Sequence, residues 1–220
     1  MTVEHPARPL PPHRPAGHRR RCCPPPLPPG NRLTSPFRER STSAMSTPTT
    51  LVHDTTLGPV TLSASPWGLT RLRFGRPAGA AQDPTPEPGS PEHAVLEQAV
   101  AELGEYLRGD RTTFEVPVDL SRVEPEHRRV LGELCAIGYG STRSYGQLAR
   151  AAELTDDGPR RAGAACARNP VLVVVPCHRI VSATGALTGY SGGLPVKKAL
   201  LALERGQLAL DAAGLTAVVG

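Results

Sequence analysis

Apolar and polar residues alternate over three short stretches near the start of the patterned sequence, at 51–53, 60–64 and 69–74. Gly58-Pro59 and Pro66-Trp67-Gly68 lie between these stretches and are typical of turns. Residues 92–108 instead carry apolar side chains at helical spacing, and Gly109 ends that run. Residues 114–120 alternate again. The pattern therefore predicts a small antiparallel meander, one helix and a further strand.

Helical spacing dominates the second half of the chain, over 127–136, 145–154 and 160–168. Gly138-Tyr139-Gly140 breaks the pattern after the first helix, and a polar turn at 155–159 separates the other two. Two short helices joined by such a turn match a helix-turn-helix, although any two packed helices give a similar pattern. Taken alone, the pattern is compatible with DNA binding and with ordinary packing.

The apolar run 171–175 leads into Pro176-Cys177-His178, and this junction carries the candidate chemistry. We expect a buried, strand-like run followed by a rigid turn, because proline fixes φ and lacks an N–H. A thiol becomes a good nucleophile only after it loses its proton to a nearby base. Neighbouring side chains on an extended segment point to opposite sides, so His178 would act through a water and need an orienting carboxylate. Taken alone, the pair fits a buried structural cysteine beside a surface histidine at least as well.

Residues 1–44 differ in composition from everything that follows, with eleven Pro, eight Arg and no helical or strand period. Such a segment cannot bury enough apolar surface to fold. We hypothesise that Met45 is the true start of the protein, which N-terminal sequencing of the native protein would test. The five cysteines form no CxxC pair, which argues against a structural zinc site. No apolar run reaches the roughly 18 residues of a membrane span.

Charge divides the patterned chain into two parts. Residues 45–125 hold eleven acidic residues against six arginines, whereas residues 126–205 hold eleven Lys and Arg against six acidic residues. A basic half favours an anionic partner such as DNA, although uneven surface charge also occurs in proteins without one. We expect a monomer in the cytoplasm, or in the nucleus of a eukaryote, without membrane association.

Five motifs occur together in the second half of the chain. They are Ser144-Tyr145-Gly146-Gln147-Leu148-Ala149, Arg168-Asn169-Pro170, Pro176-Cys177-His178-Arg179-Ile180-Val181, Gly189-Tyr190-Ser191-Gly192-Gly193-Leu194 and Lys197-Lys198-Ala199-Leu200-Leu201-Ala202-Leu203-Glu204. Their sequences and spacings resemble the O6-alkylguanine-DNA alkyltransferases, also called methylated-DNA–protein-cysteine methyltransferases. The resemblance covers roughly residues 50–206 and is most specific over 140–204.

This resemblance implies an α/β fold in two parts. A small ribonuclease-H-like sheet-plus-helix domain would span 50–122, and a mostly helical, winged helix-turn-helix-like domain would span 123–208. Residues 1–49 and 209–220 would be tails. The implied activity needs no cofactor and no metal: a methyl or other alkyl group would pass from O6 of guanine in double-stranded DNA to Cys177, once per molecule. O4 of thymine is a further candidate donor.

The resemblance also assigns the chemistry to particular residues. Cys177 would accept the alkyl group, and His178 would be the base that acts on it through a water. Glu204 would orient His178. Asn169 would tie the active-site turn to the helix-turn-helix.

A guanine turned out of the duplex would meet a second set of residues. The resemblance implies that Tyr145 helps to rotate the nucleotide and then hydrogen-bonds the base, and that Tyr190 lines the pocket. Ser191 would offer its backbone N–H to O6, and the carbonyls of Cys177 and Ile180 would accept from the 2-amino group.

Contacts to the DNA itself would come from the second helix of the helix-turn-helix and from Tyr145. Arg160, rather than Arg161, falls on the position that fills the gap left by the flipped base. The small residues that follow it, Gly163 among them, would allow the backbone to approach the minor groove closely.

Four positions depart from the usual family pattern. Glu126 and Leu131 stand where an aromatic pair is common, Ala162 where a branched residue is usual, and Cys166 where many members have a larger apolar residue. These departures concern packing, stability and affinity more than chemistry, although Cys166 is a second candidate thiol for alkylation or oxidation.

Three other functions fit parts of the sequence. A relative without catalysis would bind alkylated DNA, and a transcription regulator would use the helix-turn-helix with sequence preference; neither would take up alkyl groups. A Cys-His hydrolase would need an oxyanion loop, and no such loop is evident in the sequence.

Overall fold

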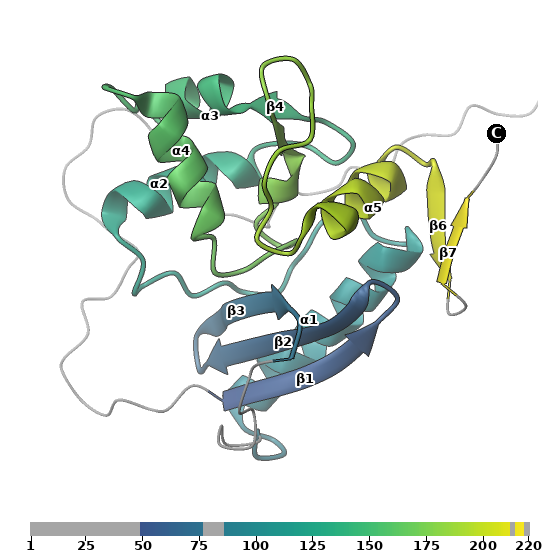
Figure 1. Ribbon diagram of the computed structural model, residues 1–220. Coiled ribbons are helices and arrows are strands. Elements are labelled where there is room, and N and C mark those ends of the chain that lie inside the picture. The colour runs from purple at the N-terminus through teal and green to yellow at the C-terminus, as the bar shows by residue number, and fades with distance from the viewer. Residues whose placement is uncertain (1–48, 77–85, 212–213, 218–220) are drawn as a thin grey trace, which may run out of the picture.

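A three-stranded antiparallel sheet opens the described part of the chain, in the order β1 (Thr49–Thr55), β2 (Gly58–Ser65), β3 (Gly68–Phe74). The predicted meander is confirmed. The structure, a computed structural model, describes residues 49–76, 86–211 and 214–217 (Figure 1). The segment 1–44 and the start proposed at Met45 lie outside these residues. Among the residues described, no helix combines the length and apolar character needed to cross a bilayer.

The helix α1 (Pro91–Arg108) covers one face of the sheet (Figure 1). Residues from β2 and α1 meet there in a shared core, which includes Val60, Leu62, Ala64, Leu96, Ala99 and Leu103. The helix begins at Ser90, whose hydroxyl accepts the His93 N–H. It ends at Gly109 in the left-handed conformation, as expected for a glycine that closes a helix.

Residues 114–120 do not form the predicted strand. Only Val118 pairs with β3, through one isolated parallel bridge. The buried carboxylate of Glu102 accounts for the difference, because it accepts the N–H groups of Glu115 and Val116 at 2.7 and 3.1 Å. These N–H groups are therefore satisfied by a side chain of α1 and need no neighbouring strand.

The second half of the described chain contains four α-helices: α2 (Pro125–Cys135), α3 (Tyr145–Ala151), α4 (Gly158–Ala167) and α5 (Leu194–Glu204). The first three pack together (Figure 1), and α3 and α4 form the predicted helix-turn-helix. The first of these two helices ends three residues before its predicted end at Leu154. Glu153 follows it with a positive φ of 51°, a conformation that stops helices.

A two-residue strand pair connects the helix-turn-helix to the segment around Cys177. β4 (Arg143–Ser144) runs parallel to β5 (Ile180–Val181). β4 leads directly into α3, where Ser144 and Gln147 form a reciprocal cap. The start of α3 is therefore held beside the chain that leaves Cys177.

The apolar run 171–175 is buried as predicted, but it is a folded loop and not a strand. Val173 has a φ of 69°, which turns the chain back on itself. The side chain of Asn169 closes this loop, because its Oδ1 accepts the Val171 N–H and its Nδ2 donates to the Val175 carbonyl. Side-chain hydrogen bonds again replace the ladder that the apolar pattern predicted.

This loop also joins the two halves of the molecule. The N–H of Leu72 in β3 donates to the Pro170 carbonyl, and the Leu72 carbonyl accepts the Leu172 N–H, both at 3.0 Å. The core continues across the joint without interruption. At the other end of the chain, where a tail was expected, β6 (Leu208–Asp211) pairs antiparallel with β7 (Gly214–Ala217).

Candidate active site

Cys177 opens a 3₁₀ turn, Cys177–Arg179, that follows the Asn169 loop directly. The expectation that Cys177 and His178 lie on an extended segment is therefore wrong. Cys177 is 4% exposed, and Nδ2 of Asn169 donates to its Sγ at 3.1 Å. Burial raises the pKa of the Cys177 thiol to about 11, while the Asn169 hydrogen bond and the nearby charge of Lys197 oppose the rise. The thiol is thus protonated at rest and needs a base to become a nucleophile.

His178 and Glu204 form a fully buried pair, with His178 Nε2 2.5 Å from Glu204 Oε1. Burial opposes the ionisation of Glu204, but the hydrogen bonds from His178 and Tyr106 and the charge of Arg179 outweigh it and lower the pKa of Glu204 to about 2. Burial is the main reason that the pKa of His178 is lowered. An ionised carboxylate only accepts, so the proton of the neutral imidazole lies on Nε2. Nδ1 then carries the lone pair, and it has no hydrogen-bond partner among the described residues.

Glu204 is held by more groups than the sequence indicated. Nε of Arg179 donates to both carboxylate oxygens, at 3.1 and 3.0 Å, and the Gly140 N–H donates to Oε2 at 2.9 Å. The hydroxyl of Tyr106, on α1, donates to Oε1. The residues that hold the carboxylate therefore come from both halves of the molecule.

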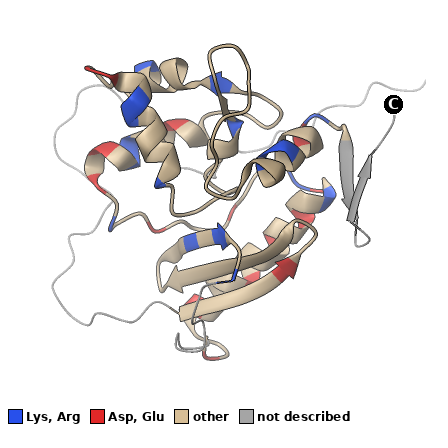
Figure 2. Cartoon of the chain, viewed as in Figure 1, with Lys and Arg blue, Asp and Glu red and all other residues tan. Residues whose placement is uncertain are grey.

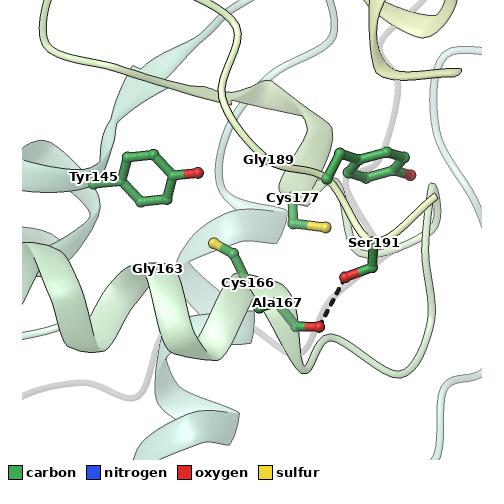
Figure 3. A pocket seen from close by; sticks show the side chains of 8 residues that line it. Tyr145, Gly163, Cys166, Ala167, Cys177, Gly189 and Ser191 are labelled. Carbon is green, nitrogen blue, oxygen red and sulfur yellow. Dashed lines mark hydrogen bonds between the residues drawn. The ribbon is translucent and has the colours of Figure 1, made fainter. Parts of the chain in front are cut away.

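A cavity of about 340 Å³ opens beside the Cys177 thiol. Its walls come from α3, α4, the 3₁₀ turn and the loop before α5, and the lining residues are Tyr145, Gly163, Cys166, Ala167, Cys177, Gly189, Tyr190 and Ser191. Figure 3 shows Cys177 and Cys166 between Tyr145 on one side and Ser191 on the other. This volume lies within the range of small-molecule binding sites.

The structure brings most of the predicted substrate residues to this cavity. The Tyr145 hydroxyl accepts from Thr188 Oγ1 at 3.2 Å, and Gly163 lies close to its ring. Tyr190 meets the His178 ring edge-on at 6.3 Å. Ser191 donates its hydroxyl to the Ala167 carbonyl at 2.7 Å (Figure 3), which anchors the loop on the end of α4.

Ile180 is the exception among the predicted substrate residues, because it is fully buried and does not line the cavity. Its carbonyl accepts from Nζ of Lys197 at 2.5 Å, and the same ammonium reaches the Thr188 carbonyl at 2.9 Å. Sequence reasoning missed Lys197. Its spacing to Leu200, Leu201 and Glu204 places it on the inward face of α5, which was a readable signal.

Arg160 and Arg161 differ sharply at the start of α4, where Figure 2 shows basic residues. Arg161 is tied down by the Glu126 carboxylate and by the Thr155 carbonyl. The side chain of Arg160 is 86% exposed, and its nearest acidic group, Asp157, lies 3.6 Å away. Arg160 is therefore the more exposed and the less tightly held of the two arginines, and it is better placed to reach an anionic partner.

The four departures from the family pattern have clear places in the structure. Glu126 binds Arg161, while Leu131 and Ala162 are fully buried in the core. Cys166 is a free thiol in the wall of the cavity, and burial raises its pKa to about 12. A buried thiol with so high a pKa is a weak nucleophile.

Comparisons with known proteins agree with this geometry. Residues 50–120 match the profile described as 6-O-methylguanine DNA methyltransferase, ribonuclease-like domain, and residues 125–206 match its DNA binding domain. Methylated-DNA–protein-cysteine methyltransferases of Mycobacterium tuberculosis and Methanosarcina acetivorans are 38% and 32% identical. The alignments cover 72% and 70% of this chain, and 93% and 96% of those proteins.

Solved structures give the same result. The crystal structure of Mycobacterium tuberculosis OGT in complex with DNA superposes with a TM-score of 0.62 at 39% identity, over 70% of this chain and 91% of that one. The expected α/β architecture, with a ribonuclease-like part followed by a DNA-binding part, is confirmed. The chain belongs to the 6-O-methylguanine DNA methyltransferase family.

Proposed function

We propose that this protein repairs DNA by moving an alkyl group from O6 of guanine onto Cys177. The observation that carries the proposal is the Cys177 thiol, which lines the cavity and directly precedes His178 in the 3₁₀ turn. His178 in turn is paired with the buried Glu204 of α5. The similar protein from Mycobacterium tuberculosis is named a methylated-DNA–protein-cysteine methyltransferase, and a relative of known structure was solved with DNA.

The chemistry follows from the protonation states of the three groups. Nδ1 of His178 takes the Cys177 proton through a water, and the thiolate attacks the alkyl carbon from the side opposite O6. The S–C bond forms as the C–O bond breaks, and the electron pair leaves with guanine, which takes up a proton. Glu204 stabilises the imidazolium that forms. No group in the site can cleave the thioether product, so each molecule acts once.

The target base must leave the duplex before the thiol can reach it, at a cost of a few kcal/mol. In our proposal Tyr145, Tyr190 and Ser191, which line the cavity, contact the flipped base there. Arg160 enters the gap that the base leaves in the stack. Gly163 keeps the surface of α4 small at the position nearest Tyr145.

Intact-mass spectrometry after mixing with an O6-methylguanine duplex tests the proposal. One added methylene, about 14 Da, should map to Cys177, and Cys177→Ala should gain nothing. Cys166→Ala is the matched control and should gain mass as the wild type does. If the protein binds the duplex without gaining mass, it is a binding or regulatory relative. The proposed roles of His178 and Glu204 in alkyl transfer would then be wrong.

A further inference from the structure

One contact to the Glu204 carboxylate comes from outside the half of the molecule that bears Cys177. Tyr106 lies on α1, in the part that matches the ribonuclease-like domain, and its hydroxyl bonds Oε1 of Glu204, 98 residues further along the chain. The other donors, His178, Arg179 and Gly140, belong to the DNA-binding half. The ribonuclease-like part therefore supplies one of the groups that bind the Glu204 carboxylate.

The position of this hydroxyl is fixed by rigid packing. Tyr106 is fully buried, and its ring lies 5.0 Å from the Phe114 ring and meets the Tyr139 ring edge-on at 5.8 Å. The helix that carries it is capped at both ends. Side chains on such elements hold their partners more accurately than side chains on loops.

The same carboxylate oxygen accepts from Tyr106 and from His178. Burial and the charge of Glu204 raise the pKa of the Tyr106 phenol far above its usual value, so the hydroxyl keeps its proton and donates. Nε of Arg179 also donates to this oxygen, at 3.1 Å, so three donors divide its charge between them. The tyrosine thus weakens the pull of Glu204 on the imidazole while it fixes the carboxylate in place.

We propose that Tyr106 is a positioning residue for alkyl transfer: by sharing Oε1 with His178, it sets how readily the imidazole gives up and takes protons, and so couples the ribonuclease-like domain to the rate. The inference rests on the proposed role of His178 as the base. The titratable and charged groups around His178 are Glu204, Lys197, Arg179, Cys177 and the tyrosines 106, 139 and 190.

The test is the pH profile of single-turnover methyl transfer by the full chain. The protein is in excess over an O6-methylguanine duplex, at a concentration that saturates the duplex. In Tyr106→Phe, Oε1 carries more negative charge, which favours protonated His178. The acid limb of the profile should move up by roughly one pH unit, the shift expected for losing one hydrogen bond to a charged group. Below the limb the rate should be about tenfold lower than wild type, and the deficit should shrink as the pH rises.

Tyr139→Phe is the matched control, because it removes a hydroxyl from the ring that packs against Tyr106, and the Tyr139 hydroxyl is not among the donors to Glu204 in the described part of the chain. Its acid limb should coincide with that of the wild type. A purely structural effect of Tyr106→Phe would lower the rate equally at every pH, and that result would overturn the inference.

A second variant keeps the test informative if Tyr106→Phe folds poorly. Site-specific 3-fluorotyrosine at position 106 preserves shape and makes the phenol a stronger donor, so the acid limb should move to lower pH. An unmoved limb would contradict the inference. His178→Ala separates the two proposals. If His178→Ala transfers methyl as fast as wild type, the assignment of His178 as the base fails. If His178→Ala is slow but the Tyr106 variants leave the acid limb unmoved, only the role of Tyr106 is removed.

Discussion

At the scale of single residues, Glu204 is the buried charge on which the polar contacts of the site converge. Its carboxylate accepts from Tyr106, Gly140, His178 and Arg179. The cost of burying a carboxylate is repaid only when its lone pairs are occupied in this way. A single substitution here consequently affects both the chemistry and the fold.

Glu204→Gln should slow methyl transfer roughly a hundredfold, the usual contribution of a well-placed base and its support. The amide keeps the shape of the side chain but cannot stabilise the imidazolium by charge. DNA affinity should change little, because Glu204 is buried, whereas Arg160, the proposed DNA contact, is exposed to solvent. Single-turnover rates and duplex titrations check the two parts, and an unchanged rate would show that Glu204 does not support His178.

Glu204 also links the free energy of unfolding to pH. Its pKa falls from 4.5 to about 2 on folding, and a group with a depressed pKa contributes stability above its unfolded value that is lost as the pH falls toward the folded one. Between pH 4.5 and the lowest pH at which the fold persists, wild type should lose stability faster than Glu204→Gln, by up to about 3 kcal/mol. Urea unfolding at several pH values measures this. Parallel curves in that window would contradict it.

At the scale of elements, the N-terminus of α4 is the part of the helix-turn-helix that separates two adjacent arginines. Arg161 stabilises the turn through Glu126 and Thr155. Arg160 extends into solvent, where our proposal places its contact with DNA. Truncation of Arg160 should therefore affect the repair of DNA, whereas truncation of Arg161 should affect the stability of the turn.

Arg160→Ala should reduce repair of an O6-methylguanine duplex by about tenfold or more, because the wedge that offsets the unstacking cost is gone. Reaction with free O6-methylguanine base should stay within about twofold of wild type, since the thiol and its base are untouched. Arg161→Ala, the control, should lower thermal stability and leave the ratio of the two rates near the wild-type value. If Arg160→Ala lost equal activity on the duplex and on the free base, the proposed insertion of Arg160 into the stack would be wrong.

Sequence patterns predicted the elements that are stabilised by local spacing and failed where distant side chains take over backbone hydrogen bonds. The meander, α1 and the helix-turn-helix follow from apolar periods and from the turn residues that separate them. The stretches 114–120 and 171–175 are strand-like in sequence, but Glu102 and Asn169 bind their backbone groups instead. The spacing of apolar residues does not show which distant side chains bind the backbone.

The same limit applies to the site. Cys177, His178 and Glu204 were identified by motif, and the structure places them together. Tyr106 lies within the predicted helix 92–108, but the sequence assigned it no role, because its contact to Glu204 joins residues 98 positions apart. Only the packing of α1 against the second half reveals it.

At the scale of the whole molecule, the two halves share a core and a hydrogen-bonded joint. Leu72 of β3 bonds Pro170 and Leu172 in the loop that precedes Cys177, and Tyr106 bonds Glu204. The loop that orders the thiol is thus held by the ribonuclease-like sheet. Loss of the sheet should disorder the site.

We expect a single cooperative unfolding transition. Trp67 is the only tryptophan in the chain and lies between β2 and β3, so its fluorescence reports on the sheet. Pulse labelling of the Cys177 thiol reports on the second half. The two urea transitions should coincide within error, and a thiol that becomes accessible before Trp67 responds would show that the halves unfold separately.

The tight turn of the helix-turn-helix is a place where the stability of the protein can be increased. Glu153, Asp156 and Asp157 hold positive φ angles of 51°, 32° and 53° without being glycine, and such residues cost on the order of 1 kcal/mol each. Glycine or asparagine at Glu153 or Asp156 would release part of that cost without touching the cavity, the thiol or Arg160. For a reagent that is consumed one molecule per lesion, this turn is the natural first place to engineer a longer shelf life.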